Sequence, residues 1–213
     1  MKRKAVALLA VVGGLVVASS ALAAIIDGTP GDDRLRGTME ADVIRAFGGN
    51  DFVNARAGND LVRAGAGDDR VQGDNGSDIA FGGTGNDRIH TGNADDVAWG
   101  GSGDDGLAGG DGPDALHGGS GNDSESGGPG DDRMWGGPGA DRLAGGAGDD
   151  TLHALAADND PDVLDCGPGH DTAKVRGSER STTRIRGCEV IVVLVTPSAE
   201  DEADEADRDA DAE

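Results

Sequence analysis

A nine-residue repeat runs through most of this chain and restricts its possible folds more than any other feature. Counted from Gly28, fourteen units follow one another to His153, and two more run from 157 to Lys174 after a three-residue insertion. The sixth position is aspartate in all sixteen units, the fourth is nearly always glycine and the eighth nearly always apolar. The 39 glycines, the 2 % aromatic content and the net charge of −23 resemble the composition of a disordered chain. A disordered chain has no reason to keep three positions in phase, so the period predicts a repetitive fold.

The most complete units read Gly-Gly-x-Gly-x-Asp, followed by an apolar residue at the eighth position. This form begins at Gly82, Gly100, Gly109, Gly118, Gly127, Gly136 and Gly145. It resembles the calcium-binding nonapeptide of the repeats-in-toxin (haemolysin-type) proteins, and the resemblance covers nearly the whole chain between its two ends. Units one to five depart from it at the first two positions, with Thr29, Thr38, Phe47, Arg56 and Ala64. In the first four units the aspartates are equally consistent with turn formation alone.

The resemblance implies an all-β fold, a right-handed parallel β-roll built from the nonapeptide repeats. Six residues of each unit would form a turn and three a short strand, so two units would complete one coil and sixteen would give about eight coils. Glycine permits the positive φ angles that such turns need. Because alternate side chains of a strand point to opposite faces, the eighth position should point inward and the seventh and ninth outward.

The eighth position provides only a thin core, which is apolar in every unit except the one with Glu125. Such a core is small compared with the entropy lost when so long a chain is ordered. We therefore expect the chain to be largely unfolded without calcium and to fold when calcium binds. Glu125 marks a weak rung of this core, and Glu125→Leu is expected to lower the calcium concentration needed for folding.

The family resemblance also implies where the ions bind. Several Ca²⁺ ions would lie between turns of adjacent coils, held by backbone carbonyls and by the sixth-position aspartates. The residues assigned to these sites are Asp69, Asp78, Asp87, Asp96, Asp105, Asp114, Asp123, Asp132, Asp141 and Asp150, with Gly83, Gly85, Gly101, Gly103, Gly110, Gly112, Gly119, Gly121, Gly128, Gly130, Gly137, Gly139, Gly146 and Gly148. The alternative is that the aspartates only stabilise turns.

A row of rings forms the second candidate site. The ninth positions of successive even-numbered units place Phe81, Trp99, His117, Trp135 and His153 in one outward file. We interpret this file as a recognition face for a cell-surface glycan, a protein or a second roll. The alternatives are a cross-strand stacking ladder and a stripe covered by the segment 185–195.

The chain begins with the pattern of a secretory signal peptide. Three basic residues precede an apolar run, and Ala21 and Ala23 form a small-residue cleavage site, so we expect a signal peptide at 1–23. An uncleaved membrane anchor is the alternative. Cleavage would leave a secreted, extracellular protein without membrane contact.

Three segments are expected in the mature chain. The calcium-binding β-roll spans 24–174, with repeats from residue 28, capping strands follow at 175–196, and 197–213 is a disordered acidic tail. Cys166 and Cys188 are the only cysteines, and in an exported protein we expect them to form a disulfide. Free or intermolecular thiols are the alternative.

The motifs of common enzymes are missing from the sequence. It contains no HExxH zinc motif, no G-x-S-x-G and no phosphate-binding loop, so we expect a non-enzymatic protein. Its net charge of −23 argues against nucleic acid as a partner. The sequence favours a secreted calcium-binding β-roll that serves as a structural, adhesion or interaction module. The alternative is a non-catalytic accessory module to a secreted enzyme acting on extracellular polysaccharide.

Overall fold

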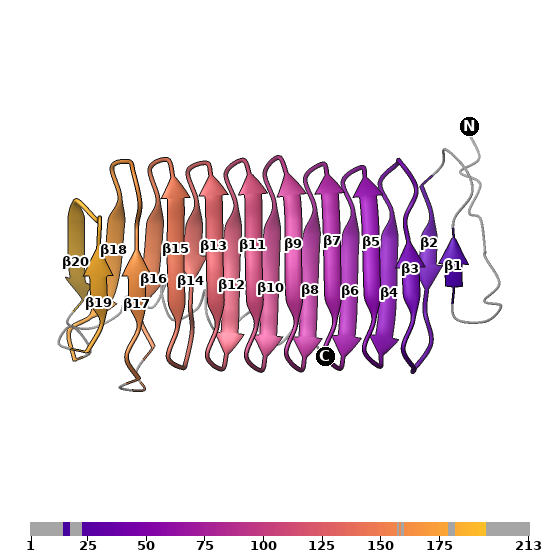
Figure 1. Ribbon diagram of the computed structural model, residues 1–213, viewed down its shortest axis with the longest axis horizontal. Coiled ribbons are helices and arrows are strands. Elements are labelled where there is room, and N and C mark those ends of the chain that lie inside the picture. The colour runs from indigo at the N-terminus through magenta and orange to yellow at the C-terminus, as the bar shows by residue number, and fades with distance from the viewer. Residues whose placement is uncertain (1–14, 18–22, 157, 159, 179–181, 195–213) are drawn as a thin grey trace.

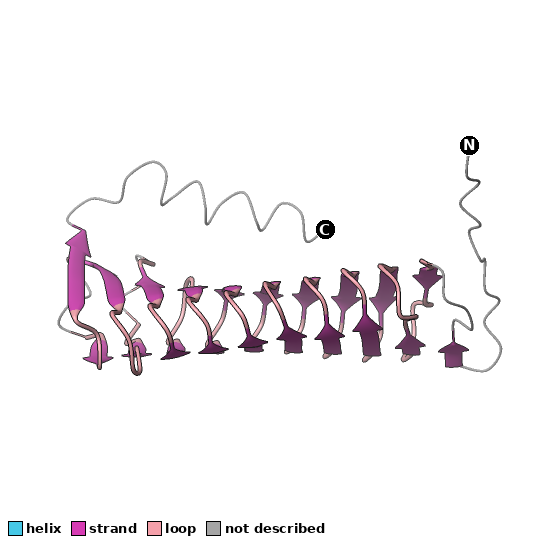
Figure 2. Cartoon of the chain, turned by 90° about the horizontal axis from the view of Figure 1, so that it is seen from above, coloured by secondary structure: helices cyan, strands magenta, loops and turns pink. Residues whose placement is uncertain are grey.

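Two parallel β-sheets face each other along the length of the molecule (Figures 1 and 2). The computed structural model describes residues 15–17, 23–156, 158, 160–178 and 182–194. The odd sheet contains β1 (Leu15–Val17), β3 (Arg34–Arg36), β5 (Phe52–Ala57), β7 (Arg70–Asn75), β9 (Arg88–Asn93), β11 (Gly106–Asp111), β13 (Ser124–Pro129), β15 (Arg142–Ala147), β17 (Val163–Asp165) and β19 (Arg184–Arg186). The even sheet contains β2 (Ile25–Asp27), β4 (Val43–Gly48), β6 (Leu61–Ala66), β8 (Ile79–Thr84), β10 (Val97–Ser102), β12 (Ala115–Ser120), β14 (Arg133–Trp135), β16 (Thr151–Ala154), β18 (Thr172–Arg176) and β20 (Val190–Leu194).

The pairing register follows the predicted coil. Consecutive strands alternate between the sheets, every pairing is parallel, and partners such as Leu107 and Ile89 lie 18 residues apart. Across the inserted residues the spacing becomes 21, as between Leu143 and Leu164. The described residues contain strands and turns but no helix. The predicted all-β parallel roll with two units per coil is therefore confirmed.

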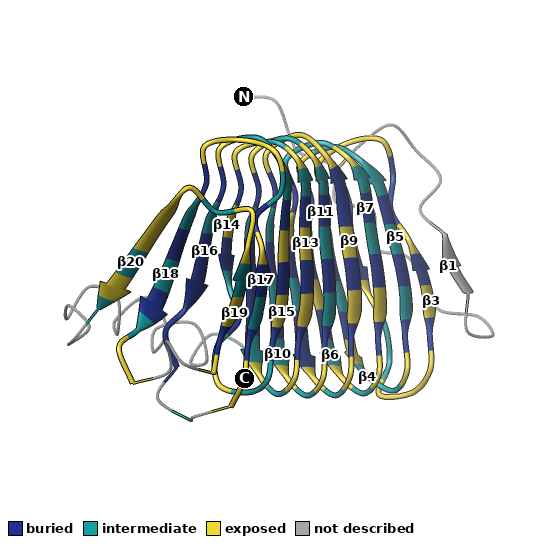
Figure 3. Ribbon diagram, turned by 60° about the vertical axis from the view of Figure 1, so that its left-hand side comes forward, coloured by how far each residue is buried: buried dark blue, intermediate teal, exposed yellow. Residues whose placement is uncertain are grey.

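The strands differ from the prediction in length. Most of them span six residues, from the seventh position of one unit to the third of the next, where three had been expected. Two inward positions alternate along each long strand, as the burial pattern of β5 shows for Val53 and Ala55 (Figure 3). The first position of each unit therefore faces the interior together with the eighth. A glycine at the first position leaves space at this inward-facing position, and oxygen atoms of the turns lie next to it, as described below.

The sheets continue beyond the sixteen units at both ends, which gives about nine coils. β2 precedes the first unit and pairs with β4, while β19 pairs with β17 and β20 with β18. β1, which lies within the predicted leader, pairs with β3. The rest of that leader and the predicted acidic tail lie outside the described residues. Within the described part of the chain, no helix has the length and apolar character needed to cross a bilayer.

Candidate metal centre

The sixth-position aspartates stack in two columns, one at each edge where the chain turns between the sheets. After the first aspartate of each column, the Oδ1 of every aspartate accepts a hydrogen bond from the backbone amide of the aspartate one coil earlier, at 2.7–3.0 Å, as from Asp87 to Asp105. The first column contains Asp33, Asp51, Asp69, Asp87, Asp105, Asp123, Asp141 and Asp162. The second contains Asp42, Asp60, Asp78, Asp96, Asp114, Asp132, Asp150 and Asp171. Half of each carboxylate is thus committed to holding coils in register.

In twelve of the sixteen aspartates, the other carboxylate oxygen has no hydrogen-bond partner among the described residues. These twelve Oδ2 atoms are buried and accept no hydrogen bond from the part of the chain that the structure describes: those of Asp51, Asp60, Asp69, Asp78, Asp87, Asp96, Asp105, Asp114, Asp123, Asp132, Asp150 and Asp171. A buried polar atom without a partner costs about 1–3 kcal/mol, and more when it is charged. A row of them at one edge of a fold indicates that a cation belongs there.

The pKa values of the sixth-position aspartates also show that ionised carboxylates are unfavourable in these columns. Burial, reinforced by neighbouring carboxylates, raises the pKa of Asp105 and of Asp141 from 3.8 to about 8. Ten more sixth-position aspartates have pKa values raised to about 6 or about 7, with burial again the largest cause. The backbone amide that each carboxylate accepts lowers the pKa only in part. Without a bound cation, these aspartates therefore bind protons at a higher pH in the folded chain than in the unfolded chain.

Where the first position of the unit is glycine, the unpaired oxygen has a place to bind a ligand. At Gly100, the Oδ2 of Asp105 and the carbonyl of Gly118 both lie under 3.0 Å from the point that a Cβ would occupy. The same convergence of a carboxylate and a carbonyl oxygen occurs at Gly82 and Gly127. We call this space, bounded by the first-position glycine and the sixth-position Oδ2 of one unit, the cradle. Ten units have this geometry, but in those of Gly28 and Gly37 a threonine already donates to the Oδ2. The cradle is open in the other eight, with Gly73, Gly82, Gly100, Gly109, Gly118, Gly127, Gly136 and Gly145.

The donor set of the cradles fits a hard cation. Ca²⁺ takes six to eight oxygens from carboxylates and carbonyls and tolerates irregular geometry. No three His, Cys, Asp or Glu side chains among the described residues form a metal site by themselves, so backbone carbonyls must complete the shell. The turn glycines make those carbonyls available, because Gly101 and Gly103 have φ of 109° and 126° and their Cβ positions would collide with carbonyls of the previous coil.

Units one and two satisfy their aspartates in another way. In unit one, the amide and hydroxyl of Thr29 donate to the Oδ2 of Asp33 at 2.5 and 2.9 Å. In unit two, Thr38 donates in the same way to Asp42 at 2.6 and 3.0 Å. These two aspartates therefore need no cation. In these two units, the threonine that replaces the second glycine of the motif forms a turn in which it donates to the sixth-position aspartate.

Other units fill the cradle with a side chain. Ala46, Ala55 and Ala64 hold the first position of units three to five and are fully buried, so a methyl group stands where the two oxygens converge elsewhere. In unit eight, Thr91 holds this position and donates to the carbonyl of Gly109 at 3.1 Å. Among the predicted ligands, Asp69 and Asp96 therefore lie in filled cradles, whereas the other eight predicted aspartates lie in open ones.

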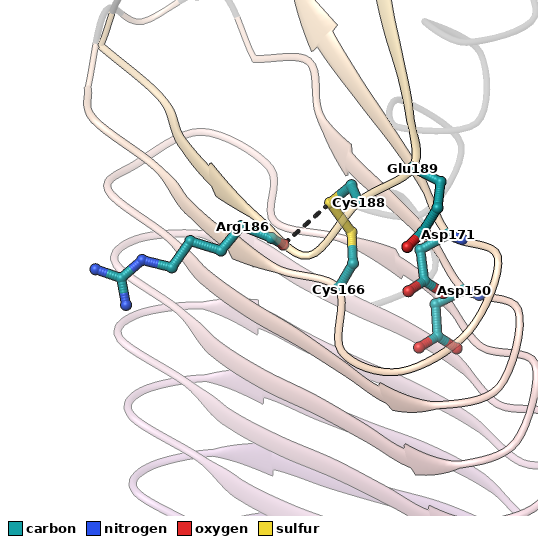
Figure 4. The surroundings of a disulfide bond; sticks show 6 residues. All are labelled: Asp150, Cys166, Asp171, Arg186, Cys188 and Glu189. Atoms are coloured by element: carbon teal, nitrogen blue, oxygen red, sulfur yellow. Dashed lines mark hydrogen bonds between the residues drawn. A yellow bond between two sulfur atoms is a disulfide. The ribbon is translucent and has the colours of Figure 1, made fainter.

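The second column ends in a covalent cap (Figure 4). Cys166 holds the first position of unit sixteen and forms a disulfide with Cys188, with 5.2 Å between the Cα atoms. The predicted disulfide is confirmed. Beside it the amide of Asp171 donates to Glu189 Oε2 at 2.8 Å, so Glu189 takes the place of the next aspartate in the column. The sequence prediction missed Glu189, although it follows Asp171 at the 18-residue spacing. It also did not name Asp51, Asp60 and Asp171, whose Oδ2 atoms are buried without a partner among the described residues.

The aromatic file forms a continuous stack on the even sheet. Neighbouring rings from Phe81 through Trp99, His117 and Trp135 to His153 have centroids 4.2–5.4 Å apart and planes within 27° of each other. Both histidines are buried, at 7 % and 6 % exposure, while Phe81, Trp99 and Trp135 are half-buried. The geometry is that of the cross-strand ladder.

The ladder continues toward the N-terminal end and is not covered by the C-terminal strand. The guanidinium of Arg63 lies 5.4 Å from the centroid of the Phe81 ring. β20 lies beside β18 in the same sheet instead of packing over the rings. The outward direction of the ninth position was predicted, but the burial of His117 and His153 was not. Stacked rings cover both faces of His117, and Trp135 covers one face of His153.

Comparison with known proteins adds one finding. The family described as RTX calcium-binding nonapeptide repeat (4 copies) matches residues 27–62, 47–80, 56–89, 72–107, 81–116, 99–124, 117–152, 126–160 and 139–173. These matches overlap and together cover all of 27–173, which includes every cradle described above. A comparison with curated proteins gave no match.

Proposed function

This chain belongs to the family of RTX calcium-binding nonapeptide repeats, and from that membership we propose that it is a secreted β-roll that folds as calcium binds and then serves as an extracellular structural or interaction module. The observation that carries the proposal is the row of buried, unpartnered Oδ2 atoms in open cradles. Calcium would be held by sixth-position aspartates and turn carbonyls, with the open cradles from Gly73 to Gly145 as the first candidates.

Calcium binding and folding are coupled because the carboxylates stacked in each column repel one another. Each coil adds two buried carboxylates to the columns, and each faces a like charge one coil away. When bound, calcium supplies the positive charge that these oxygens lack. Because the cradles form only when coils stack, the free energy of binding contributes directly to the free energy of folding. The two sheets bury few large side chains per coil, so we expect this contribution to decide whether the roll forms.

The exterior of the even sheet supports the role of an interaction module. Phe81, Trp99 and Trp135 keep part of their ring surface accessible, on a rigid sheet that orders them at fixed spacing. Such a row suits planar or apolar groups, including sugar rings and the side chains of a protein or a second roll. We assign no catalytic role to the chain, and the leader pattern at 1–23 supports secretion.

A titration of the chain with calcium, followed by far-ultraviolet circular dichroism, tests the proposal. We expect a cooperative gain of β-structure with calcium, and no such gain with magnesium, which demands a smaller and more regular oxygen shell. A spectrum that is already β-rich in chelator and unchanged by calcium would refute the coupling.

One pair of variants makes this test local. Asp105→Asn keeps the oxygen that accepts the Asp87 amide but replaces Oδ2 with a donor inside the cradle. Asp104→Asn, the exposed neighbour, removes the same charge outside the cradle. Only the first variant should raise the calcium concentration needed for folding. An equal rise in both would mean that net charge, and not the cradle, controls calcium binding.

A further inference from the structure

The outer face of the odd sheet has a hollow that belongs neither to the calcium columns nor to the aromatic file. Its volume is about 580 Å³, and it spans four neighbouring strands, β7, β9, β11 and β13. Most of its lining residues hold the seventh and ninth positions of the repeat, which point outward. Because each of these strands comes from a different coil, the hollow exists only in the stacked roll. Binding sites for small molecules commonly have volumes of this order.

Small residues form the floor of the hollow. Gly106 and Ala108 hold the two outward positions of β11, and Ser124 and Ser126 pair with them from β13. Apart from its own chain neighbours, a Cβ added to Gly106 would meet only atoms 3.9 Å or more away. The backbone of β11 is therefore accessible, and hydroxyl groups that both donate and accept hydrogen bonds lie beside it. Such a floor suits a flat group with hydroxyls of its own, such as a sugar ring.

Two arginines form one wall of the hollow. Arg70 in β7 and Arg88 in β9 are direct partners in the sheet, and both side chains are exposed. Neither makes an ion pair within 4.0 Å with a carboxylate of the part of the chain that the structure describes. Like charges directly opposite each other destabilise a sheet. In a chain with a net charge of −23, this pair is a local positive site where a bound anion would remove the repulsion.

The donors and the charge of this wall favour a phosphate group over a carboxylate. Each guanidinium presents its N–H groups in a planar fork that binds two oxygens of one anion. A carboxylate has only two oxygens and a single charge, so it satisfies one guanidinium. A phosphate monoester has three terminal oxygens and a charge of about −1.5 to −2 at pH 7. The monoester therefore matches two adjacent guanidinium groups in both respects.

We propose that this hollow binds a phosphate monoester carried on a sugar-sized group. Arg70 and Arg88 hold the phosphate, and the sugar lies over Gly106 with hydroxyl groups toward Ser124. The site is separate from the calcium cradles, which lie at the turns, and from the aromatic file, which lies on the even sheet. The roll then has a second binding face, with a ligand class that the calcium-binding repeat does not specify.

Calorimetric titration of the full chain with glucose 6-phosphate tests the proposal. The chain is measured in a solution in which circular dichroism shows the folded roll, so the result does not depend on whether calcium drives folding. We expect saturable binding of glucose 6-phosphate, with glucose and glucuronate binding weaker by about tenfold or more, because they lack the phosphate. A folded chain that does not bind glucose 6-phosphate, or that binds glucuronate equally well, would overturn the proposal.

A matched pair of variants locates the charge. Arg88→Gln removes one cation from the wall, whereas Arg34→Gln removes one from the same repeat position in β3, two strands beyond β7 and outside the hollow. We expect the first to weaken binding by about tenfold or more. The second should change it by less than about twofold, since distant exposed charges are screened. Equal losses in the two variants would refute a local site.

A third variant tests the floor without changing the charge. Gly106→Val places a β-branched side chain in the hollow at a position where a Cβ has space and φ is not positive, so the roll should still form. We expect it to weaken binding of glucose 6-phosphate by about tenfold or more while both arginines remain. An unchanged affinity would show that the ligand does not lie in the hollow. Circular dichroism checks the fold of each variant, and Arg70→Gln replaces Arg88→Gln if that variant does not fold.

Discussion

Lowering the pH should stabilise the roll in chelator and destabilise it in calcium. In the calcium-free fold, burial raises the pKa of twelve sixth-position aspartates from 3.8 to between about 6 and about 8. The folded roll therefore binds more protons than the unfolded chain between about pH 4 and pH 8, and its stability falls as the pH rises through that window. With calcium bound the carboxylates are ionised, so protons compete with the ion and the dependence is reversed.

The size of the effect follows from the number of protons. With these pKa values, about five of the twelve carboxyl groups are protonated at pH 7 in the folded chain and almost none in the unfolded chain. Solvent near the turns screens part of this difference, so we take one linked proton as a lower bound. That bound corresponds to about 1.4 kcal/mol in the free energy of unfolding per pH unit.

Guanidinium unfolding between about pH 5 and pH 8, in chelator and in calcium, measures both slopes directly. If the chain is unfolded in chelator at the upper pH, acidification should induce β-structure, which circular dichroism detects. In calcium, the midpoint of the calcium titration should move to higher concentration as the pH falls. A calcium-free roll that becomes more stable as the pH rises would refute our account of the columns.

Three further predictions concern single sites. Thr38→Val removes one of two donors to its aspartate, so the free energy of unfolding at saturating calcium should fall by about 1 kcal/mol while the number of calcium ions bound stays unchanged, as measured by guanidinium unfolding and calcium titration. Gly82→Ala places a methyl group in a cradle and should raise the calcium midpoint, whereas Gly106→Ala, whose added Cβ meets only ordinary contacts, should not. Reduction of the disulfide between Cys166 and Cys188 should lower the free energy of unfolding by about 3 kcal/mol, to be compared by unfolding with and without reductant.

The resemblance to the repeats-in-toxin proteins predicted the coil, and the nine-residue period then placed residues on its two faces and stacked the sixth positions. The pairings of Glu125 with Leu107 and Leu143 show that the 18-residue register holds even where the repeat is broken. The disulfide was also predictable, because only two cysteines are present. Local sequence and chain connectivity determine all of these features.

The parts that the sequence did not reveal depend on contacts between coils. That the first position points inward followed only from the longer strands, and with it the difference between a cradle at Gly100 and a filled one at Ala55. The sequence shows the turns of units one and two only as departures from the motif. Their structural role became evident from the hydrogen bond that Thr38 donates to Asp42. Glu189 was missed because it follows the irregular segment after unit sixteen, where the nine-residue frame is no longer visible in the sequence.

In this roll, each residue of the repeat stacks on the residue at the same repeat position one coil away. The side chains of each column must therefore interact favourably with one another. The fifth position of the odd-numbered units meets this requirement by alternation, since each side chain accepts an amide of the next coil and acids alternate with amides along Asp32, Asn50, Asp68, Asn86, Asp104 and Asn122. The ninth position meets it by ring stacking on the even sheet. At the sixth position, acids cannot alternate with amides and no rings can stack, because the residue is aspartate in every unit. A column of ionised carboxylates at about 4.8 Å spacing repels itself, so it is stabilised by protons at low pH and by cations at neutral pH. Where no threonine donates to the second oxygen, the invariant aspartate therefore supports calcium as part of the fold.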